Sequence, residues 1–187
     1  MSGGAHIDPS NKKIALLISV LALVLAFSET LAKSAQTSAL SYNIEASNLW
    51  SFFQAKNIRM TTVRTAAEAA EVELKQTTSP AKHKVLQARI DEWMQIAAKY
   101  DSEPETQEGR KELSKRAKAA EQSRTRAMAA YHYYEVASAA LQIAIVLASA
   151  QIITGVVLLT WLSGGLGVLG VILSFIGLFA PTAIRLF

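Results

Sequence analysis

Charged residues are almost confined to the middle of this 187-residue chain, and their placement constrains the fold more than any motif does. Apolar residues gather at 14–32 and 136–184, while nearly all of the charge lies between these two blocks. A run of about 20 apolar residues is long enough to cross the hydrocarbon core of a bilayer as a helix. The layout is therefore typical of a membrane protein with a charged extramembrane segment.

Three runs are predicted to span the membrane. The first is 14–32, in which Glu29 is the one ionisable residue. The second, 136–162, contains no charge, and we expect "SGG" at 163–165 to turn the chain into a third span, 166–184. A cleaved signal peptide is the alternative for the first run, because Lys12 and Lys13 precede it and "LAKSA" resembles a cleavage site.

Aromatic and basic residues flank these runs. Membrane interfaces favour amphipathic rings, and the second span is bordered by Tyr131, Tyr133, Tyr134 and Trp161. The cations that flank the spans on the side of the middle segment are Lys33, Lys118, Arg124, Arg126 and Arg185. Only two lysines lie on the N-terminal side. Since Lys and Arg are enriched on the cytoplasmic side of membrane proteins, this distribution favours a cytoplasmic middle segment. A short basic N-terminus also often stays inside, which leaves the opposite orientation open.

The middle segment, 33–135, is predicted to be a helical stalk that follows an N-terminal tail at 1–13 and the first span. No proline or glycine occurs between Pro9 and Pro80, so the first helix is expected to continue beyond the membrane. "TTSP" at 77–80 predicts a stop and a restart, with Pro80 at the first helical position. "DSEPETQEG" predicts a second break near 101–105, after which a helix from about Pro104 continues into the second span, with Gly109 as a weak point.

Apolar residues in the stalk recur alternately three and four positions apart, which is the spacing of a coiled-coil seam. On the outgoing helix the seam holds Ala39, Tyr42, Ala46, Leu49, Phe53, Lys56, Met60, Val63, Ala67, Ala70 and Leu74. Lys56 is its only charged member. The return seam holds Leu86, Ile90, Trp93, Ala97 and Tyr100, followed by Leu113, Ala117, Ala120, Ala127, Tyr131 and Tyr134, and Arg124 interrupts it.

These patterns predict an all-α membrane protein, with three transmembrane helices and a long helical hairpin or coiled-coil stalk between the first and the second. Residues 81–101 either form part of a broken antiparallel return or add a third helix to a bundle. Seams rich in alanine bury little area per residue, so we expect further copies of the chain to add stability.

The stretch "NLWSFFQAKNIR", 48–59, places Trp50, Phe52 and Phe53 beside Lys56. One helical face cannot bury all three rings. A wide core covered by the second stalk helix is one interpretation. A contact surface for another copy or for a different protein is the other, because aromatic rings next to cations are frequent interface anchors.

The same stretch, extended as "NIEASNLWSFFQAKNIR", resembles the bacterial membrane-protein family known as domain of unknown function 4337. The resemblance lies in Asn48, Trp50, Gln54, Ala55 and Lys56, with aromatic residues at 52 and 53. The resemblance extends to the arrangement of one span, a helical middle and a C-terminal hairpin, which covers most of the chain. The N-terminus departs from the family, because it is short and basic rather than long, acidic and histidine-containing. The resemblance implies a bacterial inner membrane and no known chemistry.

Polar and small residues inside the spans are the remaining candidates. Glu29 stands four residues before Lys33, the order that favours a helical ion pair, although intramembrane carboxylates also serve ions and protons. Gln142 and Gln151 are expected to hydrogen-bond between helices. A flat face is predicted on the third span, either for packing within the hairpin or for oligomer contact, from Gly167, Gly170, Ser174 and Gly177.

The sequence offers no catalytic pattern. It has no cysteine, and the pair His132 and Glu135 matches no metal motif. Residues 33–135 carry 16 Lys and Arg against 13 Asp and Glu, a balance that argues against nucleic-acid binding. We therefore expect no cofactor, no metal and no enzymatic activity.

The expected partners are the lipid bilayer, further copies of the chain and the subunits of other membrane complexes. Our first hypothesis is a scaffold that self-associates through the stalk and the small-residue faces of the spans. The second is an accessory subunit of a transporter or a respiratory assembly. The third is an oligomeric channel that uses Glu29.

Overall fold

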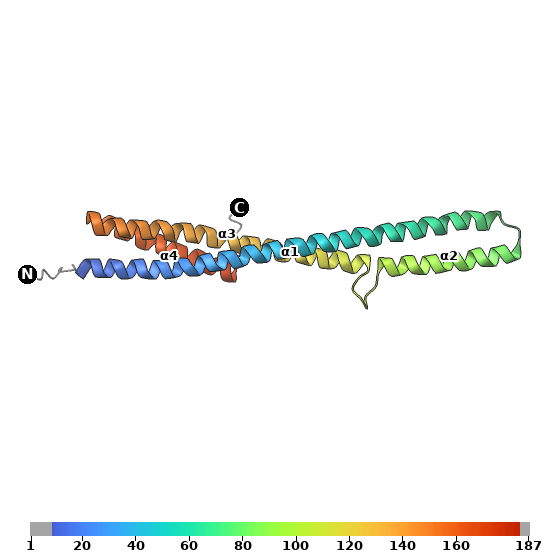
Figure 1. Ribbon diagram of the computed structural model, residues 1–187, viewed down its shortest axis with the longest axis horizontal. Coiled ribbons are helices and arrows are strands. Elements are labelled where there is room, and N and C mark those ends of the chain that lie inside the picture. Colours follow the sequence, from blue (N-terminus) through green and yellow to red (C-terminus); the bar gives the residue numbers. More distant parts are fainter. Residues whose placement is uncertain (1–8, 184–187) are drawn as a thin grey trace, which may run out of the picture. The chain divides into compact units, whose positions relative to one another are not determined.

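The computed structural model describes residues 9–183, and that range is helical with no strand (Figure 1). Its helices are α1 (Pro9–Gln76), α2 (Pro80–Asp101), α3 (Arg110–Thr154) and α4 (Val157–Phe179). They form two compact units, each described separately below. The membrane unit contains residues up to 40 and from 124 onward, and the stalk unit contains 41–123. Arg185 and the tail before Pro9 lie outside the described residues.

Three of the helices, α1, α3 and α4, are long and apolar enough to cross a membrane. In the membrane unit, Leu21, Leu141 and Ala144 form the buried centre of their contact. Helix α1 passes the end of its apolar run at residue 32 without a break and continues into the stalk unit, as the absence of proline and glycine predicts. The arrangement is that of a multi-pass membrane protein.

The turn between the last two spans lies at Gly155 and not at the predicted position, 163–165. Helix α3 ends at Thr154, and Gly155 makes the turn in the left-handed region at φ 72°, where its amide donates to the carbonyl of Gln151. The expected turn at 163–165 is wrong, because Ser163 is buried inside α4. The uncharged run that begins at 136 therefore divides at Gly155, and both resulting lengths lie near the 20 residues that a membrane requires. Trp161 lies within α4 and not at the exit of the second span.

The stalk unit is an antiparallel hairpin with an interrupted return. Near the tip, Ala67 and Ala70 of α1 pack with Ile90 of α2. Further back, Leu49 of α1 packs with Leu113 of α3. Helix α2 and the first turns of α3 thus cover successive parts of α1 (Figure 1), and residues 81–101 belong to a broken return rather than to a bundle. At 1.5 Å per residue, the outgoing and returning helices of this unit are each about 54 Å long.

The two breaks differ in length. Residues 77–79 separate α1 from α2, and Pro80 starts α2. The second break extends from 102 to 109, so the expectation that helix resumes near Pro104 is wrong. Gln107 adopts a φ of 59°, which a continuing α-helix does not allow, and the buried Gly109 directly precedes α3.

Candidate functional site

Lys56 is buried in the stalk unit at 8% exposure, although it is the one charged residue in the seam of α1. Its ammonium lies 3.5 Å from a carboxylate oxygen of Glu103 and 4.0 Å from one of Glu108, both in the break between α2 and α3. The same nitrogen lies 5.4 Å from the ring centre of Phe52 and 5.6 Å from that of Tyr100. A buried cation requires such partners, so Lys56 links α1 to the break in the return.

A second set of contacts joins the two sides of the same break. Asp101, at the end of α2, accepts a hydrogen bond of 2.8 Å from Arg110 at the start of α3. Arg110 also donates to the side-chain oxygen of Asn57 on α1, at 2.7 Å. Lys111 pairs with the other oxygen of Asp101 at 2.7 Å. These bonds tie all three helices of the unit together where the return is interrupted.

Glu112 closes the break from the side of α3. It accepts a hydrogen bond of 2.7 Å from the Ser102 hydroxyl and one of 3.1 Å from the Glu103 amide. Gly109 permits this approach, because a β-carbon there would overlap the Glu103 amide and the Glu112 carboxylate. We name the whole cluster the stalk junction: Lys56, Asn57, Asp101, Ser102, Glu103, Glu108, Gly109, Arg110, Lys111 and Glu112.

The carboxylates of the stalk junction favour their charged forms. Hydrogen bonding to Lys111, together with the charges of Lys111 and Arg110, lowers the pKa of Asp101 below its ordinary value. Desolvation acts to raise the pKa of Glu103, but hydrogen bonds from Lys99 and Thr106 and the nearby charges of Lys99 and Lys56 outweigh it and lower that pKa. The hydrogen bonds from Ser102 and the Glu103 amide lower the pKa of Glu112. Electrostatics thus stabilises the closed junction at neutral pH.

The aromatic stretch of α1 packs inside the same unit. Trp50, Phe52 and Phe53 are each half-buried against the cluster that α1 forms with α3. Trp50 donates its indole N–H to Glu121 of α3 at 2.8 Å and meets Phe53 edge-to-face at 5.4 Å. Lys56 is enclosed by contacts within the chain, as described above.

The small-residue face of α4 is also used within one chain. A β-carbon at Gly170 would lie 2.7 Å from Cγ of Leu141 on α3, and one at Gly167 would lie 2.5 Å from Cδ2 of Leu21 on α1. Gly177 lies against Tyr133 and Tyr134 of α3. The described contacts of this face lie within the membrane unit, which is the first of the two arrangements that the sequence allowed.

Two serine contacts accompany this packing. Ser163 donates to the carbonyl of Ala144 at 2.7 Å, and the hydroxyls of Ser28 and Ser174 lie 2.7 Å apart. Tyr133 and Tyr134, which border the second predicted span, are buried within the same unit.

Among the polar residues of the spans, Glu29 and Gln142 contact each other. The Gln142 amide on α3 donates to Glu29 of α1 at 3.1 Å. The expected ion pair between Glu29 and Lys33 is absent from the ion pairs of the described residues, so Gln142 takes the place given to Lys33. Gln151 is buried at 9% exposure, and its side-chain oxygen has no hydrogen-bond partner in the described part of the chain. We have no physical account of that orphaned oxygen.

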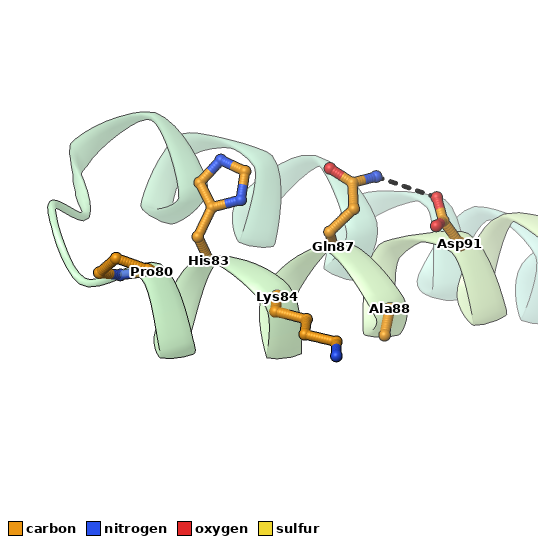
Figure 2. Close-up of a pocket in the computed structure, with 6 residues that line it drawn as sticks. All are labelled: Pro80, His83, Lys84, Gln87, Ala88 and Asp91. Carbon is orange, nitrogen blue, oxygen red and sulfur yellow. Dashed lines mark hydrogen bonds between the residues drawn. The ribbon is translucent and has the colours of Figure 1, made fainter.

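Two hollows are the other candidates for ligand sites. An apolar groove of about 270 Å³ lies between α1 and α4, lined by Val24, Phe27, Ser28, Leu31, Val171, Ser174, Phe175 and Leu178. An open depression runs along α2, where Pro80, His83, Lys84 and Ala88 lie with Gln87, which donates to Asp91 at 3.0 Å (Figure 2). One helix supplies every residue of this depression, so it does not enclose a ligand.

No group of three or more metal-ligating side chains occurs within the range that the structure describes. His132 lies 3.6 Å from Glu135, which is a pair and not a ligand set.

The acidic side of the stalk junction is absent from the predictions made from the sequence. A signal was present, because a lysine at a seam position requires carboxylates, and "DSEPETQEG" is an acid-rich interruption of the opposing helix.

The geometry defines a helical protein with three membrane-length apolar helices and a two-layered helical stalk. The model of the family described as "Domain of unknown function (DUF4337)" matches residues 10–180. The chain therefore belongs to that family, in agreement with the resemblance of its aromatic stretch. No curated protein and no solved structure matches the chain.

Proposed function

We propose that the protein is a non-catalytic, membrane-anchored scaffold that self-associates through its stalk. The observation that carries this proposal is the stalk junction, where a buried lysine and its carboxylate partners fix the interruption of the return helix. Those contacts give the hairpin a defined shape at the point where it would otherwise bend. A hairpin fixed in this way suits a spacer that holds other chains at a set distance from the bilayer.

Self-association is supported by the apolar side chains that the stalk hairpin leaves exposed. A two-layered hairpin buries one face of each helix, and α1 of the stalk unit exposes Ile44, Ile58 and Val72 at 52%, 66% and 56%. The small-residue face of α4 is occupied within the chain, so the stalk is the better candidate for contact between copies. We extend the proposal to the cytoplasmic membrane of a bacterium with the stalk on the cytoplasmic side, as the distribution of Lys and Arg favours.

Co-purification of two differently tagged copies tests this proposal. Both copies are expressed together in a bacterial membrane, extracted in mild detergent and captured through one tag. We expect the second tag in the eluate, and it should be absent when the copies are expressed separately and mixed only after extraction. Recovery of one tagged copy alone, without any partner, would remove the support for a scaffold.

A second candidate function is an accessory subunit of a larger membrane complex. The groove between α1 and α4 favours it, since apolar side chains of a foreign transmembrane helix can fill such a surface. The same purification discriminates the two functions. Foreign subunits in a fixed ratio, with no second copy of this chain, would identify an accessory subunit.

The channel hypothesis depends on Glu29, which is exposed and accepts the Gln142 hydrogen bond. Ion flux in proteoliposomes that is unchanged by Glu29→Gln would eliminate it.

A further inference from the structure

We propose that an uncharged stripe along α1 in the stalk unit is the contact surface for the same stripe of a second, parallel copy. This inference deepens the proposed function and depends on it, because it names the surface and the partner through which the stalk self-associates. The positions of the stripe recur alternately three and four apart: Ser41, Ile44, Asn48, Ser51, Ala55, Ile58, Thr62, Thr65, Ala69, Val72 and Gln76. All of them are exposed except Ala55, which is half-buried.

The stripe lies on the side of α1 opposite the seam that packs within the hairpin. Each stripe position lies two residues after a seam position, which places the two faces about half a helical turn apart. The intrachain seam and the stripe therefore do not compete, and a helix with two seams of this spacing can pack on both sides.

Charge is absent from every position of the stripe, although the same length of α1 is charged elsewhere. The charged residues of 41–76 are Glu45, Lys56, Arg59, Arg64, Glu68, Glu71, Glu73 and Lys75, and all lie off the stripe. A helix face that serves only to meet water is normally charged or polar, whereas this face carries no charge and exposes Ile44, Ile58 and Val72. A continuous uncharged face on this charged helix is thus suited to a protein contact.

The stripe combines apolar side chains with hydroxyls, and those of Ser51 and Thr62 are satisfied within α1. Ile44, Ile58 and Val72 follow one another at intervals of two heptads, so they occupy the same seam position. Ser51 donates its hydroxyl to the carbonyl of Ser47 at 2.9 Å, and Thr62 donates to that of Ile58 at 3.0 Å. Covering these hydroxyls leaves no donor unpaired, which lowers the cost of excluding water.

A second copy of this chain is the partner that fits. Copies inserted in one membrane with the same topology run parallel, and a two-fold axis along the membrane normal places identical residues at equal heights. Ile44, Ile58 and Val72 then each meet their own counterparts. Asn48 occupies the alternate position of the same seam, where a pair of asparagines is known to set the register of parallel dimers.

One pair of flanking charges opposes this arrangement and is partly neutralised within each chain. Glu68 of one copy and Glu73 of the other come near each other in the parallel register. Lys82 pairs with Glu73 at 2.6 Å within each chain and reduces that repulsion.

Disulfide cross-linking tests the stripe directly, because the chain contains no cysteine and single-cysteine variants have no background. Ile58→Cys and Thr65→Cys place a thiol on the stripe. Arg64→Cys is the matched control, since it is exposed and one residue away but on a different face. In proteoliposomes under mild oxidation we expect a covalent dimer as the main species for the two stripe variants and little for the control, since a disulfide needs β-carbons about 4 Å apart. Equal cross-linking of all three variants would overturn the proposal.

Orientation requires a mixed experiment with Ile44→Cys and Val72→Cys copies that carry different tags. Parallel copies should form only dimers of like with like. A disulfide between the two different tags would show antiparallel packing and would overturn the parallel arrangement.

The double variant Ile44→Lys, Ile58→Lys separates this inference from the proposed function. Both side chains are exposed, so the helix content should not change, while the fraction of dimer at a fixed dilution should fall by about tenfold or more because like charges face each other. An oligomeric wild type whose mass this variant leaves unchanged would overturn the stripe and leave self-association in place. A monomeric wild type would overturn both.

Discussion

At the level of single residues, Lys56 and Gly170 each occupy an enclosed position. The charge of Lys56 and the small size of Gly170 fit those positions. Lys56 occupies a seam position where an apolar side chain is normal, and its ammonium is neutralised by carboxylates from the break in the return. Gly170 occupies a helix contact where any side chain is too large. Lys99 and Gly165 are residues of the same types in open environments, and they provide the matched controls.

Replacing Lys56 with methionine keeps the packing on Phe52 and Tyr100 but leaves Glu103 and Glu108 without their buried partner. We expect a loss of about 1–2 kcal/mol in the free energy of unfolding, less than for a fully buried pair because Glu108 is half exposed. Lys99→Met is the control, since Lys99 also pairs with Glu103 but is 71% exposed, and it should cost at most about 0.5 kcal/mol. Chemical unfolding followed by circular dichroism measures both, and equal losses would contradict a special role for Lys56.

Gly170→Ala should destabilise the membrane unit by about 1–3 kcal/mol. The added methyl group would overlap Leu141 and approach the carbonyl of Ala137 at 3.2 Å, and backbone cannot move aside easily. Gly165→Ala meets open space and should be neutral or slightly stabilising. Unfolding in mixed micelles of increasing denaturing detergent compares the two variants. If the Gly165 variant proved the weaker, the packing of α4 described above would be wrong.

At the scale of elements, the interruption between α2 and α3 is held by charges and therefore depends on pH. The pKa values of Asp101, Glu103 and Glu112 are lowered in the folded protein, so their contribution to stability is complete above the ordinary values of 3.8 for Asp and 4.5 for Glu. It is lost as the pH falls through those values toward the lower values of the folded state.

We expect the thermal unfolding midpoint of the full chain to be constant from about pH 7 to 5 and to decrease below pH 4.5. In Glu112→Gln, which cannot lose a charge, the decrease should be smaller. Circular dichroism over a pH series in neutral detergent gives both curves. A variant that loses as much stability between pH 5 and 3 as the wild type would contradict this role of the junction.

The elements were predictable from the sequence to different degrees. The unbroken course of α1 and the restart at Pro80 follow from local chemistry, since proline and glycine are absent before Pro80. The turn at Gly155 was not predicted because "SGG" is a stronger local turn signal, and the hydrogen bond that joins Ser163 of α4 to Ala144 of α3 connects residues that are not neighbours in sequence. The stalk junction was missed because its residues are distant in sequence and meet only after the return helix folds back.

The whole molecule has three membrane-length helices and a hairpin stalk. We propose that the stalk brings copies of the chain together. Resemblance in the aromatic stretch correctly indicated the family, but its rings proved to pack within one chain. The surface that we propose for association is the uncharged stripe of α1. The seam pattern does not predict it, because the stripe lies on the face of α1 opposite the seam.

The mass of the protein in lipid nanodiscs tests self-association most directly. Nanodiscs assembled from native membranes, at low protein density and without added detergent, are weighed by native mass spectrometry after release of the lipid. We expect species at twice the 20.2 kDa of one chain or at a higher multiple. A single species at 20.2 kDa, with no other protein bound, would contradict it.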